Sequence, residues 1–171
     1  RAAYNVGVGG ATSKTALDRA VGYVRRCSNS DGSFGYMSGG RAGSWGTEGA
    51  DGVPRAAAGA MTLMHAGIYR ADDAVLGPAL VFLRKHVEDH LRGQGNWYWY
   101  GQYYAAQAMF ESPDRADWDR YWAKAWPLIV SRQGADGLWS GPDTSYGAPF
   151  NTAMVLIILQ IPDNYLPILL R

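Results

Sequence analysis

The sequence is poor in three features that mark large classes of proteins. It has a single cysteine, Cys27, which excludes a framework of internal disulfides and a cysteine-rich zinc module. Its 16 basic and 15 acidic residues leave a formal charge of +1, so it lacks the excess of positive charge that a nucleic-acid-coating protein needs. Its longest apolar run, Ala153 to Ile161, is interrupted by Gln160 and is too short to span a bilayer. We therefore expect no nucleic-acid partner and no transmembrane segment.

The composition is that of a folded domain with many aromatic residues. A length of 171 residues suits one domain or a part of a larger one, and a 47% apolar, 18% charged composition excludes disorder. The 22 glycines lack the triplet period of collagen. Seven Trp and eleven Tyr occur largely in short clusters. Because the first residue is Arg1 and not Met, we expect the chain to be processed, excised from a longer protein or described from an internal point, and no compartment is assigned.

Three segments share a turn in which a glycine precedes an aromatic residue by two positions. The pairs are Gly32 and Phe34, Gly95 and Trp97, and Gly137 and Trp139. Apolar residues lie 10, 14 and 17 positions before each aromatic residue, which places them on one stripe of an α-helix. The pattern predicts three copies of an amphipathic helix that ends in a Gly-x-aromatic turn.

A second, nearly uncharged helix is predicted after each turn, over residues 54 to about 69, 98 to about 110 and 149 to about 160. Pro54 and Pro149 lie where two of these helices should begin, since a proline in the first turn forfeits no internal hydrogen bond. Pro127, inside the third charged helix, should kink that helix or shift its start. Residues 1–12 are predicted to be a lead-in linker and 13–171 the repeat domain, with a long glycine-rich loop at 35–52.

The turns resemble those of a known repeat family. Residues 133–139 (QGADGLW) match the pattern Gln-x-x-x-Gly-x-Trp in full, residues 28–34 (SNSDGSF) carry Ser28 for Gln and Phe34 for Trp, and residues 91–97 match only at Gly and Trp. Over most of residues 13–171 the chain resembles the terpenoid cyclase and protein prenyltransferase family, with its prenyltransferase and squalene oxidase repeats, including bacterial members of uncharacterised function. In such a turn Gln133 can bond carbonyl groups at the end of the charged helix, while Trp139 packs over its side chain.

That resemblance implies an all-α fold in which helix pairs close into an α/α toroid. The apolar helices would surround a central cavity, and the charged helices would form the outside. The sequence supplies about three pairs, a partial toroid, so another protein chain or a missing part of the same protein should complete it.

Neither catalytic signature of the family is present. The cyclases use an Asp-x-Asp-Asp acid, but Asp72 and Asp73 follow Arg70 and Ala71, so the first acid is missing and we expect the pair to cap a helix. Cys27 lacks the surrounding ligands of a prenyltransferase zinc site. We therefore expect no cofactor.

Four residues are weak candidates for chemistry. Glu48 and Asp51, in the long loop, can do acid–base work if burial raises the pKa of one of them. His86 and His90 are spaced by one helical turn, as metal ligands are, but no third ligand is evident. A solvated helix end, where a cation suits the helix dipole, is the interpretation that we favour for both histidines.

The aromatic residues after the second turn are the strongest candidate surface. Trp97, Tyr100, Tyr103 and Tyr104 share one helix face, which can contact an isoprenoid chain, a cation or a sugar, or can pack against another helix or chain. Three further tryptophans, spaced by four residues on the third charged helix, are predicted to pack in the core or an interface; they are Trp118, Trp122 and Trp126.

Three functions are open on this basis. We favour a non-catalytic interaction or hydrophobic-ligand-binding module in a larger assembly, with an isoprenoid or lipid as its ligand. The first alternative is an isoprenoid-processing enzyme whose acid is Glu48, Asp51 or a residue outside the chain. The second is a carbohydrate-active α/α barrel with the aromatic face as its sugar-stacking surface.

Overall fold

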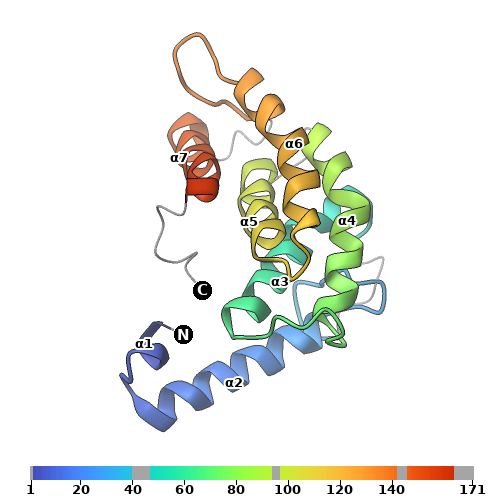
Figure 1. Cartoon of the computed structure of the whole chain (residues 1–171), viewed down its shortest axis with the longest axis vertical. Helices are drawn as coiled ribbons and strands as arrows, with labels where there is room; N and C mark the ends of the chain where they lie inside the picture. Colours follow the sequence, from blue (N-terminus) through green and yellow to red (C-terminus); the bar gives the residue numbers. More distant parts are fainter. Residues whose placement is uncertain (1, 40–46, 94–96, 142–145, 164–171) are drawn as a thin grey trace.

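The computed structural model describes residues 2–39, 47–93, 97–141 and 146–163, and the expected all-α class is confirmed there. These residues form no strand, and helices α2 to α7 pack together (Figure 1). The elements are α1 (Ala2–Asn5), α2 (Gly10–Cys27), the 3-10 helix η1 (Gly49–Gly52), α3 (Val53–His65), α4 (Leu76–Arg92), α5 (Tyr98–Glu111), α6 (Ala116–Ser131), α7 (Gly147–Gln160) and the 3-10 helix η2 (Ile161–Asp163). Within these ranges, none of the helices combines the length and the apolar character that crossing a bilayer requires.

Charged and apolar helices alternate along the chain and lie in two rows. The apolar row consists of α3, α5 and α7, in which α3 packs on α5 and α5 on α7. The charged row contains α4 and α6, which lie side by side against α3 and α5 (Figure 1). Small residues such as Ala57, Ala60 and Ala105 are fully buried. Their size lets the apolar helices approach one another closely.

The first and third turns are built alike. An antiparallel bridge joins Ser28 to Phe34 in the first turn and Gln133 to Trp139 in the third. Gly32 and Gly137 occupy the same left-handed conformation, with φ of 88° and 80°. Gly95, the corresponding glycine of the second turn, lies outside the described residues.

In the third turn the glutamine and the tryptophan have different roles from those expected. Gln133 Nε2 donates to the carbonyl oxygen of Gly137 at 2.9 Å, inside the turn itself. It is the indole Nε1 of Trp139 that donates to a carbonyl near the end of α6, that of Ile129, at 2.8 Å. The expectation for Gln133 is therefore wrong. The Trp139 indole is the larger side chain, and its N–H reaches the helix carbonyl in place of the glutamine amide.

In the first turn the residue at the glutamine position does bond the end of its helix. Ser28 Oγ donates to the Arg25 carbonyl oxygen at 2.7 Å. The Phe34 side chain has no N–H to donate. It is instead buried against α3, where a Cβ on Gly59 would lie only 2.6 Å from its ring. The two turns thus share a backbone but fix their helix ends by different side chains.

Helix α6 runs from Ala116 to Ser131 with Pro127 inside it, so the shifted start that was one expectation for this proline is not seen.

The three tryptophans of α6 stack from the core outward. Trp118 is buried, its ring is 4.7 Å from that of Trp122, and Trp122 is 6.0 Å from the partly exposed Trp126. The inner end of this stack packs in the core, and its outer end reaches the surface.

The end of α2 is held to the start of α4 by an ion pair. Arg25 Nη2 lies 2.6 Å from Asp73 Oδ2, and Asp73 Oδ1 accepts the backbone N–H groups of Val75 and Leu76 at 3.0 Å. Asp73 therefore has the capping role expected of the acidic pair, whereas Asp72 bonds the exposed Arg70.

Replacing Asp73 by asparagine should destabilise the fold in a pH-dependent way. Burial acts to raise the pKa of Asp73, but the Arg25 guanidinium and the two N–H groups outweigh it and lower the pKa from 3.8 to about 2. A lowered pKa stabilises the folded state above pH 4, and this contribution is lost as the pH falls toward 2. The shift corresponds to about 2 kcal/mol.

Urea unfolding at two pH values tests this expectation. The loss in the Asp73→Asn variant should be about 2 kcal/mol at pH 7 and about half of that at pH 3. Asp72→Asn is the matched control and should change nothing measurable, because its ion pair is exposed. An Asp73→Asn loss that is equal at both pH values would contradict the proposed ionic origin.

Candidate functional site

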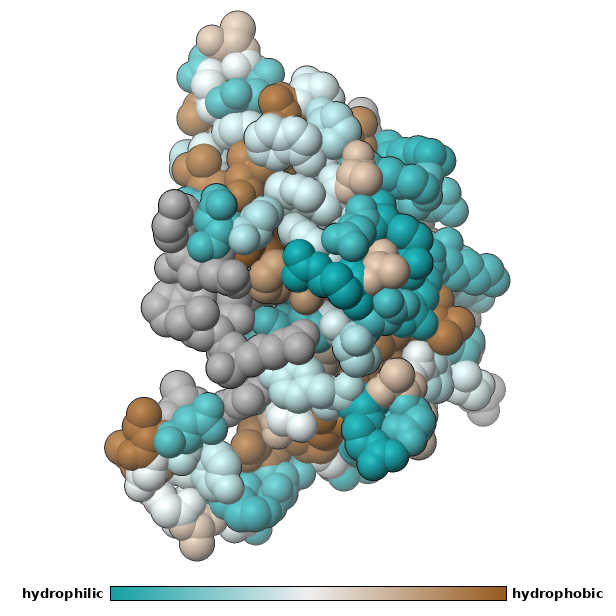
Figure 2. Space-filling model, viewed as in Figure 1, coloured by the Kyte–Doolittle hydropathy of each residue, from teal (hydrophilic) through white to brown (hydrophobic). Residues whose placement is uncertain are grey.

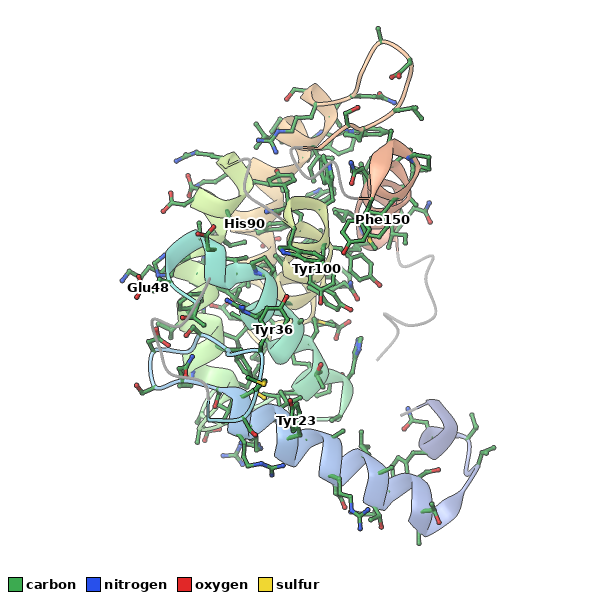
Figure 3. The ribbon with its side chains drawn as sticks, turned by 180° about the vertical axis from the view of Figure 1, so that it is seen from behind. Tyr23, Tyr36, Glu48, His90, Tyr100 and Phe150 are labelled. Carbon is green, nitrogen blue, oxygen red and sulfur yellow. The ribbon has the colours of Figure 1, made fainter. Side chains whose placement is uncertain are left out.

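A groove of about 600 Å³ lies between the end of α2, the segment that follows it, α3 and α5. Its volume is that of a site for a small molecule. Figure 3 shows three of its tyrosines following one another along one side of the molecule. The principal lining residues are Tyr23, Phe34, Tyr36, Arg55, Trp97 and Tyr100.

The floor of the groove is one face of α3. Pro54, Ala58 and Thr62 line it, and their spacing of four residues places them on the same side of the helix. Gly59 lies beside them, and the Phe34 ring rests directly on its backbone. Because these residues are small, the floor leaves room between the larger side chains of the two walls.

The aromatic face expected after the second turn is present. The rings of Trp97 and Tyr100 are 6.0 Å apart, those of Tyr100 and Tyr104 are 4.9 Å apart, and those of Tyr103 and Tyr104 are 4.9 Å apart, all in edge-to-face contact. Tyr146, at the start of α7, extends the series because its ring is 5.5 Å from Trp97. Trp97 and Tyr100 line the groove, and Tyr103 and Tyr104 continue the aromatic face along α5.

Trp97 stands in an unusual backbone conformation. It directly precedes α5 with φ of 62°, and it is the only residue other than glycine with a positive φ in the described ranges. This conformation is costly for a bulky side chain, and such strain is concentrated at functional sites. Trp97 is 43% exposed and is one of the residues that line the groove.

Two opposite charges lie where the groove meets the start of α3. Arg55 is half-buried, and its guanidinium carbon lies 4.8 Å from the centre of the Tyr36 ring, a cation–π contact. Asp51, in η1, also lines the groove. Burial raises the pKa of Tyr100, with smaller contributions from the nearby Tyr104 and Tyr36, so that its hydroxyl stays a neutral donor at pH 7. The groove thus joins apolar aromatic walls to one polar end.

No family model, curated protein or solved structure matches this chain. The resemblance of residues 28–34 and 133–139 to the repeat family stays a prediction. The function proposed below is therefore argued from the groove.

The two acidic candidates lie close together in the chain but differ in their relation to the groove. Asp51 lines it, whereas Glu48 precedes η1 and is not among the lining residues. Both side chains are exposed (Figure 3 labels Glu48). The burial on which the acid–base hypothesis depended is therefore missing at both positions.

The expectation of a solvated helix end is wrong for His90. It is only 5% exposed, its Nδ1 lies 2.7 Å from Gln102 Nε2, and its ring stacks on Tyr98 at 5.6 Å. Burial lowers its pKa to about 4, so it is neutral at pH 7. Tyr121 donates its hydroxyl to Gln102 Oε1 at 2.8 Å, so the amide Nε2 is the donor to His90.

Gly101 is the physical reason for this burial. A Cβ at Gly101 would lie 2.5 Å from His90 Cε1, so the missing side chain provides the space for the imidazole between α4 and α5. His86, one turn earlier, is half-buried with its ring 4.7 Å from that of Phe82. Among the described residues, no three His, Cys, Asp or Glu side chains converge.

Sequence reasoning missed half of the groove. Tyr23, Tyr36 and Arg55 belong to α2, the following segment and α3, and their approach to Trp97 and Tyr100 depends on how the helices pack. Arg55 had one local signal, because it is a charge at the start of an otherwise apolar helix. The two tyrosines had none.

Proposed function

We propose that the chain is a non-catalytic module that binds an elongated apolar ligand in the groove. The observation that carries this proposal is the volume of about 600 Å³, walled by aromatic rings from separate segments of the chain. Each methylene group that such a site removes from water contributes about 0.8 kcal/mol, so a chain of isoprenoid length gains enough for specific binding. The exposed positions of Glu48 and Asp51 favour binding over acid–base catalysis.

The aromatic walls favour an isoprenoid over a saturated lipid. Tyr and Trp rings present their π-faces and edges to a ligand, and branched unsaturated chains match both their shape and their polarisability. Arg55 and Asp51 give the ligand a polar end to align with, which suits an alcohol head group. We therefore propose an isoprenoid alcohol as the ligand class.

The two helix rows also support the proposal that the chain is part of an α/α toroid. Three apolar helices in succession, of which α3 and α5 are each backed by a charged helix, and turns that share a bridge are the arrangement that such a fold requires. The groove lies along the apolar helices α3 and α5, which in a toroid would face the central cavity.

The ligand proposal predicts that Tyr100→Ala weakens binding of farnesol about tenfold. The substitution removes one aromatic wall, and an aromatic contact with its buried area contributes roughly 1.5 kcal/mol. Binding is measured by isothermal titration, with quenching of tryptophan fluorescence as a second readout, since Trp97 is at the site.

Tyr103→Ala is the matched control, because it removes the same side chain from the same helix outside the groove. It should bind farnesol as the native chain does, and both variants should keep the native melting temperature within a few degrees. The proposal is overturned if the native chain does not bind farnesol or if both variants lose affinity equally. Binding of maltohexaose in place of farnesol would favour the carbohydrate alternative.

A further inference from the structure

His90 is the one polar side chain that α4 buries in the core. Figure 2 shows hydrophilic residues on the side of the molecule where α4 lies, whereas the other buried residues of this helix are all apolar. His90 Nδ1 is satisfied by Gln102, but Nε2 is buried and has no hydrogen-bond partner within the described ranges. A buried polar atom without a partner lowers the stability of the fold, so its presence in a native core calls for a reason.

The hydrogen bonds around His90 fix which of its ring nitrogens carries the proton. Tyr121 donates its hydroxyl to Gln102 Oε1 at 2.8 Å, so the Gln102 amide offers an N–H to His90 Nδ1. Nδ1 is therefore the acceptor, and the proton of the neutral imidazole lies on Nε2. The atom without a partner is thus an N–H donor, fixed in one orientation by two neighbouring side chains.

The Nε2 edge of this ring faces the polar end of the groove. The position that a Cβ on Gly101 would take is 2.8 Å from His90 Nε2 and also 2.8 Å from Cγ of Pro54, which lines the groove. Asp51, another lining residue, is close enough to act on the imidazole. Burial lowers the pKa of His90 to about 4, and the Asp51 charge acts in the opposite direction. Nε2 therefore lies directly behind the part of the groove wall that Pro54 forms.

The Pro54 ring is a part of the wall that can move. A change of pucker in a proline ring displaces Cγ while the backbone stays in place, and side-chain movements of this size are common when a ligand binds. Pro54 is in the first turn of α3 and has no backbone N–H, so the movement breaks no hydrogen bond of the helix. A ligand oxygen can then reach His90 Nε2 from the groove.

We infer that His90 and Asp51 together select a ligand that carries a hydroxyl group at this end of the groove. The inference rests on the ligand-binding function proposed above and names the residue that recognises the head group. A hydroxyl oxygen accepts the Nε2–H of His90 while its hydrogen is donated to the Asp51 carboxylate, so one group satisfies both. A hydrocarbon leaves Nε2 without a partner, and a carboxylate or phosphate meets the negative charge of Asp51.

Farnesol and farnesene, which has the same carbon skeleton without the hydroxyl, test this role in a titration calorimeter. His90→Phe keeps a ring at the position and removes the donor. It should lower the ratio of farnesol affinity to farnesene affinity about tenfold relative to the native chain. The ratio cancels any general effect of the substitution on the shape of the groove.

His86→Phe is the matched control, because His86 is half-buried one turn earlier on α4 and is not a lining residue. It should keep the native ratio. A native ratio in His90→Phe as well overturns the inference and leaves the binding function standing. A native chain that binds neither compound overturns both.

Nuclear magnetic resonance of the native chain with 15N-labelled histidine tests the contact without a substitution, and it decides the matter if His90→Phe does not fold. We expect the His90 ring to carry its proton on Nε2 at pH 7. The Nε2 and proton signals should shift when farnesol binds, and much less when farnesene binds. A proton on Nδ1, or an Nε2 signal that bound farnesol leaves in place, overturns the inference.

Discussion

Asp117→Ala is expected to lower the free energy of unfolding by about 3 kcal/mol, because it removes the centre of a buried ionic network. The Asp117 side chain is 0% exposed. Its two oxygens accept hydrogen bonds from Arg84 at 2.7 Å, from Arg120 at 2.6 Å and from Ser112 at 2.6 Å. Since Arg84 belongs to α4 and Asp117 to α6, the network holds the two charged helices together.

Chemical unfolding in urea, followed by circular dichroism, measures the loss. Asp119→Ala is the control, since this acid lies in the same first turn of α6 but is exposed and pairs with Arg115 only at 3.7 Å. It should change nothing measurable. Burial acts to raise the pKa of Asp117, but Arg84, Ser112 and Arg120 outweigh it and lower the pKa, so the contribution of Asp117 should fade as the pH drops below about 4. An Asp117→Ala variant as stable as the native chain at pH 7 would show that the network holds nothing together.

The helices were predictable because their signals are local. Apolar residues such as Leu80, Leu83 and Val87 recur at helical spacing before each Gly-x-aromatic turn, and the same periodicity separates charged from apolar helices. Asp73 was likewise recognisable as a cap from its place before α4. These features depend on residues within one or two turns of each other, which a sequence displays directly.

The errors concern side chains whose surroundings come from other helices. His90 looks like a solvated residue in the last turn of a charged helix, but Gly101 on α5 makes room for its ring. For the same reason, only a part of the groove could be predicted from the sequence. Trp97 and Tyr100 belong to one helix end and could be grouped, whereas Tyr23 and Tyr36 join them only through the packing of α2 and α3. The sequence also could not show which side chain of the third turn bonds which carbonyl. Gln133 bonds the carbonyl of Gly137 within the turn, and Trp139 bonds that of Ile129 in α6.

The same substitution in the two equivalent turns should have unequal effects. Gly137→Ala places a Cβ in the left-handed region at φ of 80°, with only Gln133 Nε2 nearby at 4.0 Å, so we expect a loss of about 1–2 kcal/mol from backbone strain alone. Gly32→Ala adds a collision to the same strain, because its Cβ would lie 2.1 Å from the carbonyl oxygen of Pro78 at the start of α4. Since that contact is with backbone, either the turn or α4 must move, and the loss should reach about 4 kcal/mol or more.

Thermal and urea unfolding of the two variants side by side measure the difference. Each variant is the control for the other, because the type of turn, the backbone conformation and the added methyl group are the same. Only the atoms near the new Cβ differ. Equal losses would mean that α4 shifts away from the first turn at little cost. A gap of about 2 kcal/mol or more would mean that the first turn is wedged against α4, and that α2, otherwise so little buried, is held in place by this contact and by Arg25 and Asp73.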